Sequence, residues 1–144
     1  MVNLEEIIKN LPFSSPFLFV NELIYVNEKG ASGNFTFHKE MDFFKGHFKG
    51  YPIVPGTILI ESMAQIGGAC LGIFYKLKEN KQEPIITVAT SYEAEFFKPV
   101  YPGEKVTVTS DLIYLRFGKL KYKVHMKNEK DEIVAKGVFS GMLK

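Results

Sequence analysis

The sequence predicts an α+β fold in which one long helix is wrapped by a curled antiparallel sheet. Three observations predict it: a single long helical pattern near the centre of the chain, strand-like alternation on both sides of that pattern, and a length of 144 residues with 46% hydrophobic content, which suits one core. A lone apolar helix between antiparallel strands is buried most completely when the sheet curls around it. Because no repeat or linker interrupts the pattern, we expect residues 1–144 to form a single domain.

The first third of the chain predicts a short helix and then a hairpin. Apolar residues recur at helical intervals in residues 3–10, and two prolines follow that segment. Residues 18–27 and 31–37 flank the turn NEKGAS. We expect Gly30 to take a positive φ angle in this turn, as tight hairpins require.

The long helix is predicted from Gly56 to about Lys78. Pro55 precedes it, and the charged segment KENKQEP ends it. Its uncharged stretch, residues 62–75, spans about 14 residues, fewer than the roughly 20 that a membrane span needs. We therefore expect the buried helix of a soluble protein.

Four strands are predicted after the helix. Their alternation is clearest in KLKYKVHMK, where every second residue is apolar or aromatic and the residues between are basic, so one face is buried and the other is wet. Turn sequences such as YPGE and NEKD separate the strands. The expected strands are residues 85–97, 104–116, 119–128 and 132–143.

Composition excludes several classes of function. A formal net charge of +2 is too balanced for the basic face that non-specific nucleic-acid binding requires. The single cysteine, Cys70, can form neither an intramolecular disulfide nor a cysteine-based zinc site, and we expect it to pack in the core. The N-terminal segment MVNLEEIIKN is acidic and amphipathic, unlike a secretory signal, which favours a cytoplasmic protein.

The segment GHFKGYPIVPGTILIESMAQ, residues 46–65, combines the features that point to chemistry. It contains His47, a Pro-Gly pair ending in Gly56 at the predicted helix start, and a lone acid, Glu61, in an apolar run. Burying a carboxylate is costly unless the group is paired or serves a reaction. Glu61 therefore has either a partner or a catalytic task.

From Phe43, the sequence FFKGHFKGYPIVPGTILIESMAQ resembles the signature of the FabZ-type 3-hydroxyacyl-acyl-carrier-protein dehydratases, which have the hot-dog fold. LPFSSPFLFV and AEFFKPVYPGEKVTV resemble further segments of that family. Glu at position 61 favours FabZ-type enzymes over the FabA-type dehydratase-isomerases, which have Asp there. The resemblance implies dehydration of 3-hydroxyacyl thioesters to trans-2-enoyl thioesters in fatty acid, polyene or other specialised acyl biosynthesis.

The residue types suit that reaction, which needs a base for the α-proton, an acid for the hydroxyl group and a donor for the thioester carbonyl. His47 fits the base, because an imidazole can be neutral near pH 7. Glu61 fits the acid, because a carboxyl group in apolar surroundings can hold a proton. The N–H of Gly56 at the positive end of the helix can polarise the carbonyl, and Gln65, one turn beyond Glu61, can orient the carboxyl group.

The resemblance also implies partners. In the family, the His and the acid of one site come from different subunits, so we expect a homodimer with composite sites, with a trimer of dimers as a further option. The substrate would arrive on the phosphopantetheine arm of acyl carrier protein, and no metal, nucleotide or flavin motif is present. Lys45, Lys49 and Lys98 flank segments that resemble the tunnel mouth and are candidates for docking the carrier.

Other interpretations stay open. His47 could be a structural residue among phenylalanines, and Glu61 could form a buried salt bridge, for instance with Lys45 or Lys49. The chain could be a hot-dog thioesterase, a dehydratase-isomerase or a non-catalytic acyl-binding partner subunit. His38 and His125 are expected to be solvated, so they suggest no metal site.

The chain departs from the family pattern at its opening segment. Phe13, Ser14 and Ser15 stand where the family usually has His, Arg and Tyr, and that Tyr helps to gate the acyl tunnel, so chain-length preference does not transfer. FFK at residues 96–98 also adds an aromatic residue where basic residues are more typical. With 13 Phe in the chain, we expect an aromatic-lined tunnel suited to a flat or conjugated acyl chain.

Overall fold

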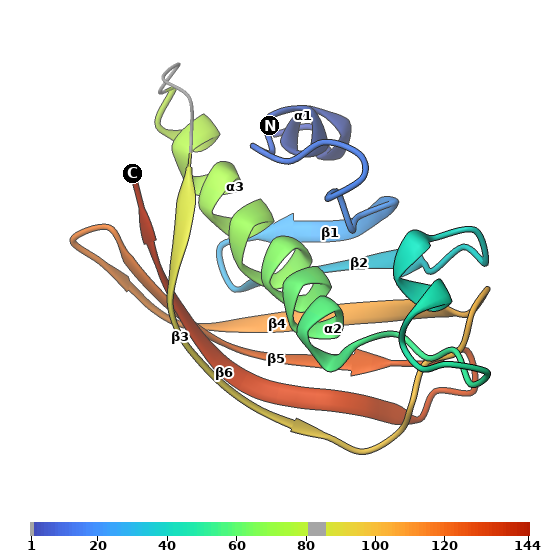
Figure 1. Ribbon diagram of the computed structural model, residues 1–144. Coiled ribbons are helices and arrows are strands. Elements are labelled where there is room, and N and C mark those ends of the chain that lie inside the picture. Colours follow the sequence, from blue (N-terminus) through green and yellow to red (C-terminus); the bar gives the residue numbers. More distant parts are fainter. Residues whose placement is uncertain (1, 81–85) are drawn as a thin grey trace.

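The computed structural model describes residues 2–80 and 86–144, and it shows the predicted long helix in a curled antiparallel sheet (Figure 1). Within these residues, six strands form one sheet in the order β1-β2-β4-β5-β6-β3. In chain order the elements are α1 (Leu4–Lys9), β1 (Glu22–Asn27), β2 (Gly30–Thr36), the 3₁₀ helix η1 (Asp42–Lys45), α2 (Gly56–Ala64), the π-helical turn η2 (Gln65–Ala69), α3 (Cys70–Lys78), β3 (Thr87–Phe96), β4 (Lys105–Arg116), β5 (Lys119–Lys127) and β6 (Ile133–Leu143).

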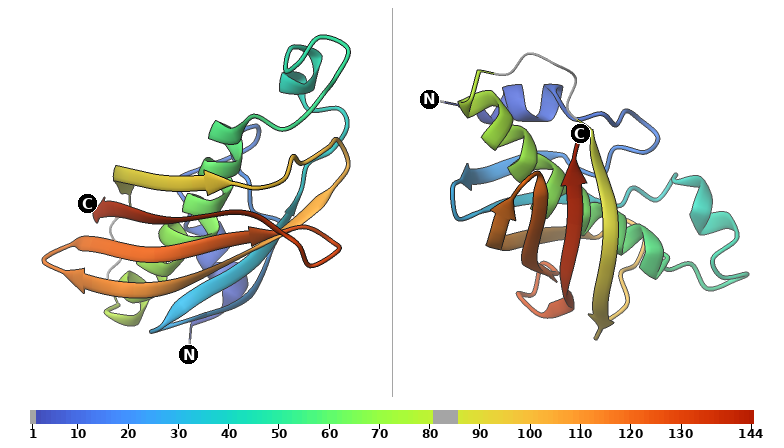
Figure 2. Two further views of the ribbon diagram at one scale, coloured as in Figure 1. Left: turned by 90° about the horizontal axis from the view of Figure 1, so that it is seen from below. Right: turned by 90° about the vertical axis from the view of Figure 1, so that its left-hand side faces the viewer.

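The central helix runs without a break through α2, η2 and α3, from Gly56 to Lys78, as the sequence predicts. Its apolar positions are buried in the core, among them Leu59, Met63 and Ile66. Of the segments that the structure describes, this helix alone is long and apolar enough to cross a membrane, but 72% of its apolar window is buried inside the fold. It is the core helix around which the sheet curls (Figures 1 and 2).

Two glycines in η2 let the helix approach the sheet closely. A Cβ atom at Gly67 would lie 3.1 Å from side-chain atoms of both Ser110 and Val124, and one at Gly68 would collide with the ring of Tyr122. The hydroxyl of Ser110 on β4 donates a hydrogen bond of 2.8 Å to the carbonyl oxygen of Gly67. Short π-helical turns inside α-helices are frequent at functional sites, and this one begins at Gln65, directly after the turn that carries Glu61.

The strands of the sheet differ in burial. Along β5 every second residue is buried, as the alternation in KLKYKVHMK predicts. β3, by contrast, lies at the edge of the sheet, pairs only with β6 among the described strands, and exposes most of its residues. An unpaired strand edge is a template for pairing with another chain.

The first predicted strand is shorter in the structure. The prediction placed it at residues 18–27, whereas β1 begins at Glu22. The N–H of Phe19 donates instead to the side chain of Gln65, at 2.8 Å, which ties this segment to the central helix. The remaining strands and both helices follow the predicted order. η1 was not predicted, and residue 85, at the start of the predicted strand 85–97, lies outside the described residues.

The prediction for Gly30 is wrong, because its φ angle is not positive. Glu28 and Lys29 join the two strands, with Asn27 paired to Gly30, and the N–H of Lys29 donates to the Asn27 side chain at 2.8 Å. Gly30 is required for space, since a Cβ atom there would collide with the carbonyl oxygen of Ser110 on the adjacent strand. The absence of a side chain at Gly30 therefore allows β2 and β4 to pack closely.

Candidate active site

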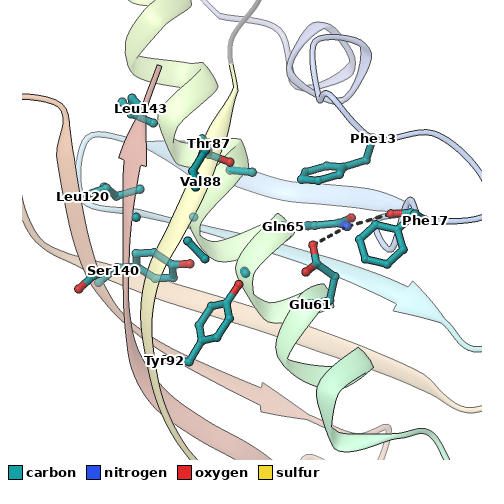
Figure 3. A pocket seen from close by; sticks show the side chains of 16 residues that line it. Phe13, Phe17, Glu61, Gln65, Thr87, Val88, Tyr92, Leu120, Ser140 and Leu143 are labelled. Carbon is teal, nitrogen blue, oxygen red and sulfur yellow. Dashed lines mark hydrogen bonds between the residues drawn. The ribbon is translucent and has the colours of Figure 1, made fainter.

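Glu61 lies on the second turn of the central helix, where its half-buried side chain enters a cavity of about 190 Å³ between the helix, β3 and the N-terminal segment (Figure 3). Leu59, Ser62 and Met63 in the same turns face the core. The helical period consequently leaves Glu61 on the side that faces the cavity. Burial of the apolar face of the helix thus leaves the Glu61 carboxyl group facing the cavity.

Gln65 holds the Glu61 carboxyl group. Its side-chain oxygen accepts a hydrogen bond of 2.8 Å from the N–H of Phe19, so its amide NH₂ must face the other way. This NH₂ donates to Oε2 of Glu61 at 3.0 Å and to the carbonyl oxygen of Phe17 at 2.9 Å (Figure 3). The hydrogen bond expected between Gln65 and Glu61 is present, and Gln65 is 1% exposed, so its orientation is fixed.

The cavity is more polar at one end than at the other. Glu61 and Gln65 lie at the polar end, whereas Val88, Leu120 and Leu143 line the opposite end (Figure 3). An acyl chain is apolar along its tail and polar at the thioester, so the cavity has the polarity of such a ligand.

Aromatic side chains form much of the cavity wall. Phe13 and Phe17 come from the N-terminal segment, with ring centroids 6.3 Å apart, and Tyr92 and Tyr122 come from the sheet. The expected aromatic lining is present, and Phe13 is one of the residues at which this chain departs from the usual family pattern. A preference for flat acyl chains remains a prediction.

Sequence reasoning missed the two tyrosines. Burial is the main cause that raises the pKa of Tyr92, and the charge of Glu61 adds to it. Burial also raises the pKa of Tyr122, which is 4% exposed. Both hydroxyl groups therefore remain protonated near neutral pH and can donate hydrogen bonds into the cavity. The period-two alternation of β3 was the available signal for Tyr92, because it places Tyr92 and Ala94 on the helix-facing side.

His47 lies in the loop between η1 and the central helix. Its Nδ1 is 3.1 Å from the carbonyl oxygen of Ile53, and its ring stacks on Phe48 with centroids 4.2 Å apart. A carbonyl oxygen can only accept, so Nδ1 carries the hydrogen in this contact. In the neutral ring, Nε2 then has a free lone pair and can accept a proton.

One chain does not bring His47 and Glu61 together. His47 does not line the cavity that Glu61 enters, and no hydrogen bond or ion pair joins the two among residues 2–80 and 86–144. Each residue is instead held by its own partners, Ile53 and Gln65 respectively. The predicted base and acid therefore lie in separate parts of the fold.

Gly56 begins the central helix, and no hydrogen bond to its N–H is present within the described residues. The ring of Phe96 covers this position, since a Cβ atom at Gly56 would lie 3.2 Å from that ring. The free N–H at the positive end of the helix can donate to a carbonyl oxygen. Gly56 thus offers an unpaired backbone donor, within the described residues, next to an aromatic side chain.

The three candidate docking lysines are all exposed but differ in their partners. Lys45 pairs with Asp42 at 3.0 Å, and Lys98 pairs with Glu132 at 3.1 Å. Within the described part of the chain, no ion pair of Lys49 is present. Lys49 therefore offers the least compensated positive charge of the three.

Cys70, His38 and His125, which the sequence analysis also considered, differ in their burial. Cys70 is fully buried, as expected, and burial raises the pKa of its thiol. His38 is exposed, but His125 is half-buried, contrary to expectation, and burial together with the charge of Lys127 lowers its pKa. In the part of the chain that the structure describes, no group of three or more His, Cys, Asp or Glu side chains comes together as a metal site would require.

Comparison with known protein families gives a match over most of the chain. Residues 11–141 match the FabA-like domain. Three curated proteins named 3-hydroxyacyl-acyl-carrier-protein dehydratase FabZ are similar to this chain. The protein from Wolbachia pipientis subsp. Culex pipiens is 38% identical over 134 residues, covering 91% of this chain and 90% of its own. The protein from Ehrlichia canis is 34% identical, and the match covers 99% of this chain and 95% of that protein. The protein from Thermus thermophilus is 33% identical, and the match covers 91% of this chain and 90% of that protein.

Solved structures share the fold at low sequence identity. A chain of the dehydratase heterocomplex ApeI:P from Xenorhabdus doucetiae aligns with a TM-score of 0.81 at 11% identity, covering 96% of this chain and 90% of its own. A thioesterase from Haemophilus influenzae aligns with a TM-score of 0.69 at 14% identity, covering 100% and 92%. The hot-dog architecture is therefore common to proteins of different activities.

Proposed function

The chain belongs to the FabA-like family, and we propose that it is a FabZ-type lyase that dehydrates 3-hydroxyacyl thioesters of acyl carrier protein in fatty acid biosynthesis. The observation that carries this function is Glu61, a single carboxyl group held by Gln65 at the polar end of an otherwise largely apolar cavity. The cavity suits an acyl tail, and the carboxyl group suits a reaction at the carbon atoms near the thioester.

We assign the proton transfers to two residues. The neutral ring of His47 takes the α-proton through Nε2, while Glu61 gives its proton to the 3-hydroxyl group. The C3–O bond breaks, the electrons of the C2–H bond form the C2–C3 double bond, and the oxygen leaves as water. His47 ends protonated and Glu61 ends ionised, and exchange with solvent restores both groups.

Gly56 stabilises the charge that develops during this step. Removing the α-proton moves negative charge onto the thioester oxygen, and a fixed donor in a water-poor site stabilises that charge most strongly. The N–H at the start of the central helix is such a donor, and the absence of a side chain permits close approach. Phe96 lies against Gly56 and covers part of this position.

The active site requires two subunits. Among residues 2–80 and 86–144, His47 and Glu61 do not share a cavity, and β3 has one strand edge with no partner, beside the cavity that Glu61 enters. Pairing of β3 with β3 of a second copy would join the two sheets and bring the His47 and Gly56 of one subunit toward the Glu61 of the other. A homodimer then has two equivalent composite sites.

The proposed partner is acyl carrier protein, whose phosphopantetheine arm carries the substrate. No other prosthetic group is needed, because His47, Glu61 and Gly56 supply the base, the acid and the carbonyl donor. The expected compartment is the cytoplasm. Lys49 is the leading docking residue, because its positive charge is uncompensated within the described residues.

Incubation of the purified protein with a 3-hydroxyacyl carrier protein, followed by mass spectrometry of the carrier, tests this function. The predicted product has lost one water, and it does not form with the Glu61→Gln variant. An unchanged hydroxyacyl mass would contradict dehydration, and a bare carrier would show a thioesterase instead.

A further inference from the structure

Tyr92 on β3 faces Glu61 across the cavity, and its hydroxyl group points into the same space as the carboxyl group (Figure 3). Gln65 occupies only Oε2 of Glu61, so Oε1 keeps no hydrogen-bond partner among the described residues. The Tyr92 hydroxyl likewise has none within that part of the chain. Oε1 of Glu61 and the Tyr92 hydroxyl can therefore each form a further hydrogen bond within the cavity.

The position of Tyr92 is fixed by its packing. It pairs with Phe139 across β3 and β6, and the two rings meet edge to face with centroids 4.8 Å apart. Glu61 and Tyr92 line the same cavity, and no hydrogen bond joins them among the described residues. The charge of Glu61 also contributes to raising the pKa of Tyr92. The space between them can hold a small polar group.

We propose that the Tyr92 hydroxyl and Oε1 of Glu61 together bind the 3-hydroxyl group of the substrate, so that Tyr92 is a further catalytic residue that selects hydroxylated acyl chains. This inference rests on the proposed dehydratase function. When the C3–O bond breaks, the oxygen keeps the bonding electrons and takes its proton from Glu61. Tyr92 donates a hydrogen bond to that oxygen and loses no proton.

This arrangement provides selectivity as well as rate. A site that hydrogen-bonds a substrate hydroxyl group discriminates strongly against an analogue without it, because the polar groups of the site are then left unpaired. The hydroxyl of Tyr122 is a less suitable donor, because it lies against Gly68 of the helix. The other end of the cavity, at Leu120 and Leu143, is mainly apolar, and Thr87 and Ser140 also line it (Figure 3).

The variant Tyr92→Phe tests this role, because it keeps the ring contact with Phe139 and removes only the hydroxyl group. We expect kcat for dehydration to fall by about tenfold, the value of one hydrogen bond. Tyr25→Phe is the matched control, since Tyr25 is 40% exposed, close to the 42% of Tyr92, and lies on β1 away from the cavity. The control variant should retain wild-type kcat.

A binding experiment separates substrate contact from a structural effect. In the His47→Ala background, which we expect to bind substrate without converting it, the Kd values of a 3-hydroxyacyl carrier protein and of the matching saturated acyl carrier protein are compared with and without Tyr92→Phe. We expect about tenfold weaker binding of the hydroxyacyl form only. Equal weakening of both ligands, or no change in either, would overturn the proposal. Dehydration by the wild-type protein is measured separately, so failure of the proposed function is distinguishable.

Discussion

Gln65 donates a hydrogen bond of 3.0 Å to Oε2 of Glu61, and the N–H of Phe19 fixes the direction of that bond by occupying the oxygen of the same amide. The N-terminal segment, the central helix and the carboxyl group therefore form one hydrogen-bonded unit. Oε1 of Glu61 keeps no hydrogen-bond partner among the described residues, and Glu61 lines the cavity, where in the proposed reaction it delivers a proton to the substrate.

Replacing Gln65 should damage both activity and stability. Gln65→Met keeps the approximate volume but leaves the Phe19 N–H and the Phe17 carbonyl oxygen without their partner and releases Glu61. We expect the free energy of unfolding to fall by about 1–3 kcal/mol and kcat to fall at least tenfold. Urea denaturation and steady-state kinetics measure the two effects. Wild-type kcat in a folded Gln65→Met variant would remove its assigned role in orienting Glu61.

Gly30→Ala should destabilise the protein, because the added methyl group would meet the carbonyl oxygen of Ser110. Separation of β2 from β4 is expected to cost about 1–3 kcal/mol of the free energy of unfolding. Gly46→Ala is the control, since nothing lies within 4 Å of the position that its Cβ would occupy. Urea titration of both variants checks the difference, and equal midpoints would contradict the spatial explanation for Gly30.

Reversing the charge of Lys49 should weaken docking of the carrier. Lys49→Glu is expected to raise KM for carrier-linked substrate by about tenfold at low salt while leaving KM for a small-molecule thioester nearly unchanged. Lys98→Glu should have a smaller effect, because Glu132 already compensates Lys98. Steady-state kinetics give the KM values for both substrates. Equal effects of Lys49→Glu on the two KM values would exclude docking of the carrier protein at Lys49.

Phe13 should limit the acyl chains that the cavity accepts. Phe13→Ala removes a ring from the cavity wall and is expected to improve kcat/KM for longer or bent chains relative to flat polyenoyl chains. A panel of carrier-linked substrates that differ in length and unsaturation measures this shift. An unchanged order of preference would show that the opening segment does not set specificity.

Local sequence patterns predicted the elements of this fold well. Period-two alternation in β5 and the apolar run from Gly56 to Lys78 both reflect burial of one face, which each segment encodes by itself. The spacing of Glu61 and Gln65 likewise places them on neighbouring turns of one helix face, so their hydrogen bond was predictable.

Contacts between distant segments could not be predicted in this way. The start of β1 depends on a bond between Phe19 and Gln65, and the need for Gly30 depends on Ser110 of another strand. Tyr92 becomes a candidate only when β3 is placed beside the helix. The spacing of His47 and Glu61 along the chain also conceals their separation in space, because they follow different elements of the fold.

The composite active site is tested most directly by a heterodimer in which one subunit carries His47→Ala and the other carries Glu61→Gln. Co-expression with two affinity tags isolates this species, and dehydration is followed by mass spectrometry of the carrier. Because one of its two sites keeps an intact His47 and Glu61, we predict about half of the wild-type activity, whereas each single-variant homodimer is inactive. A heterodimer as inactive as its parents would contradict sites shared between subunits.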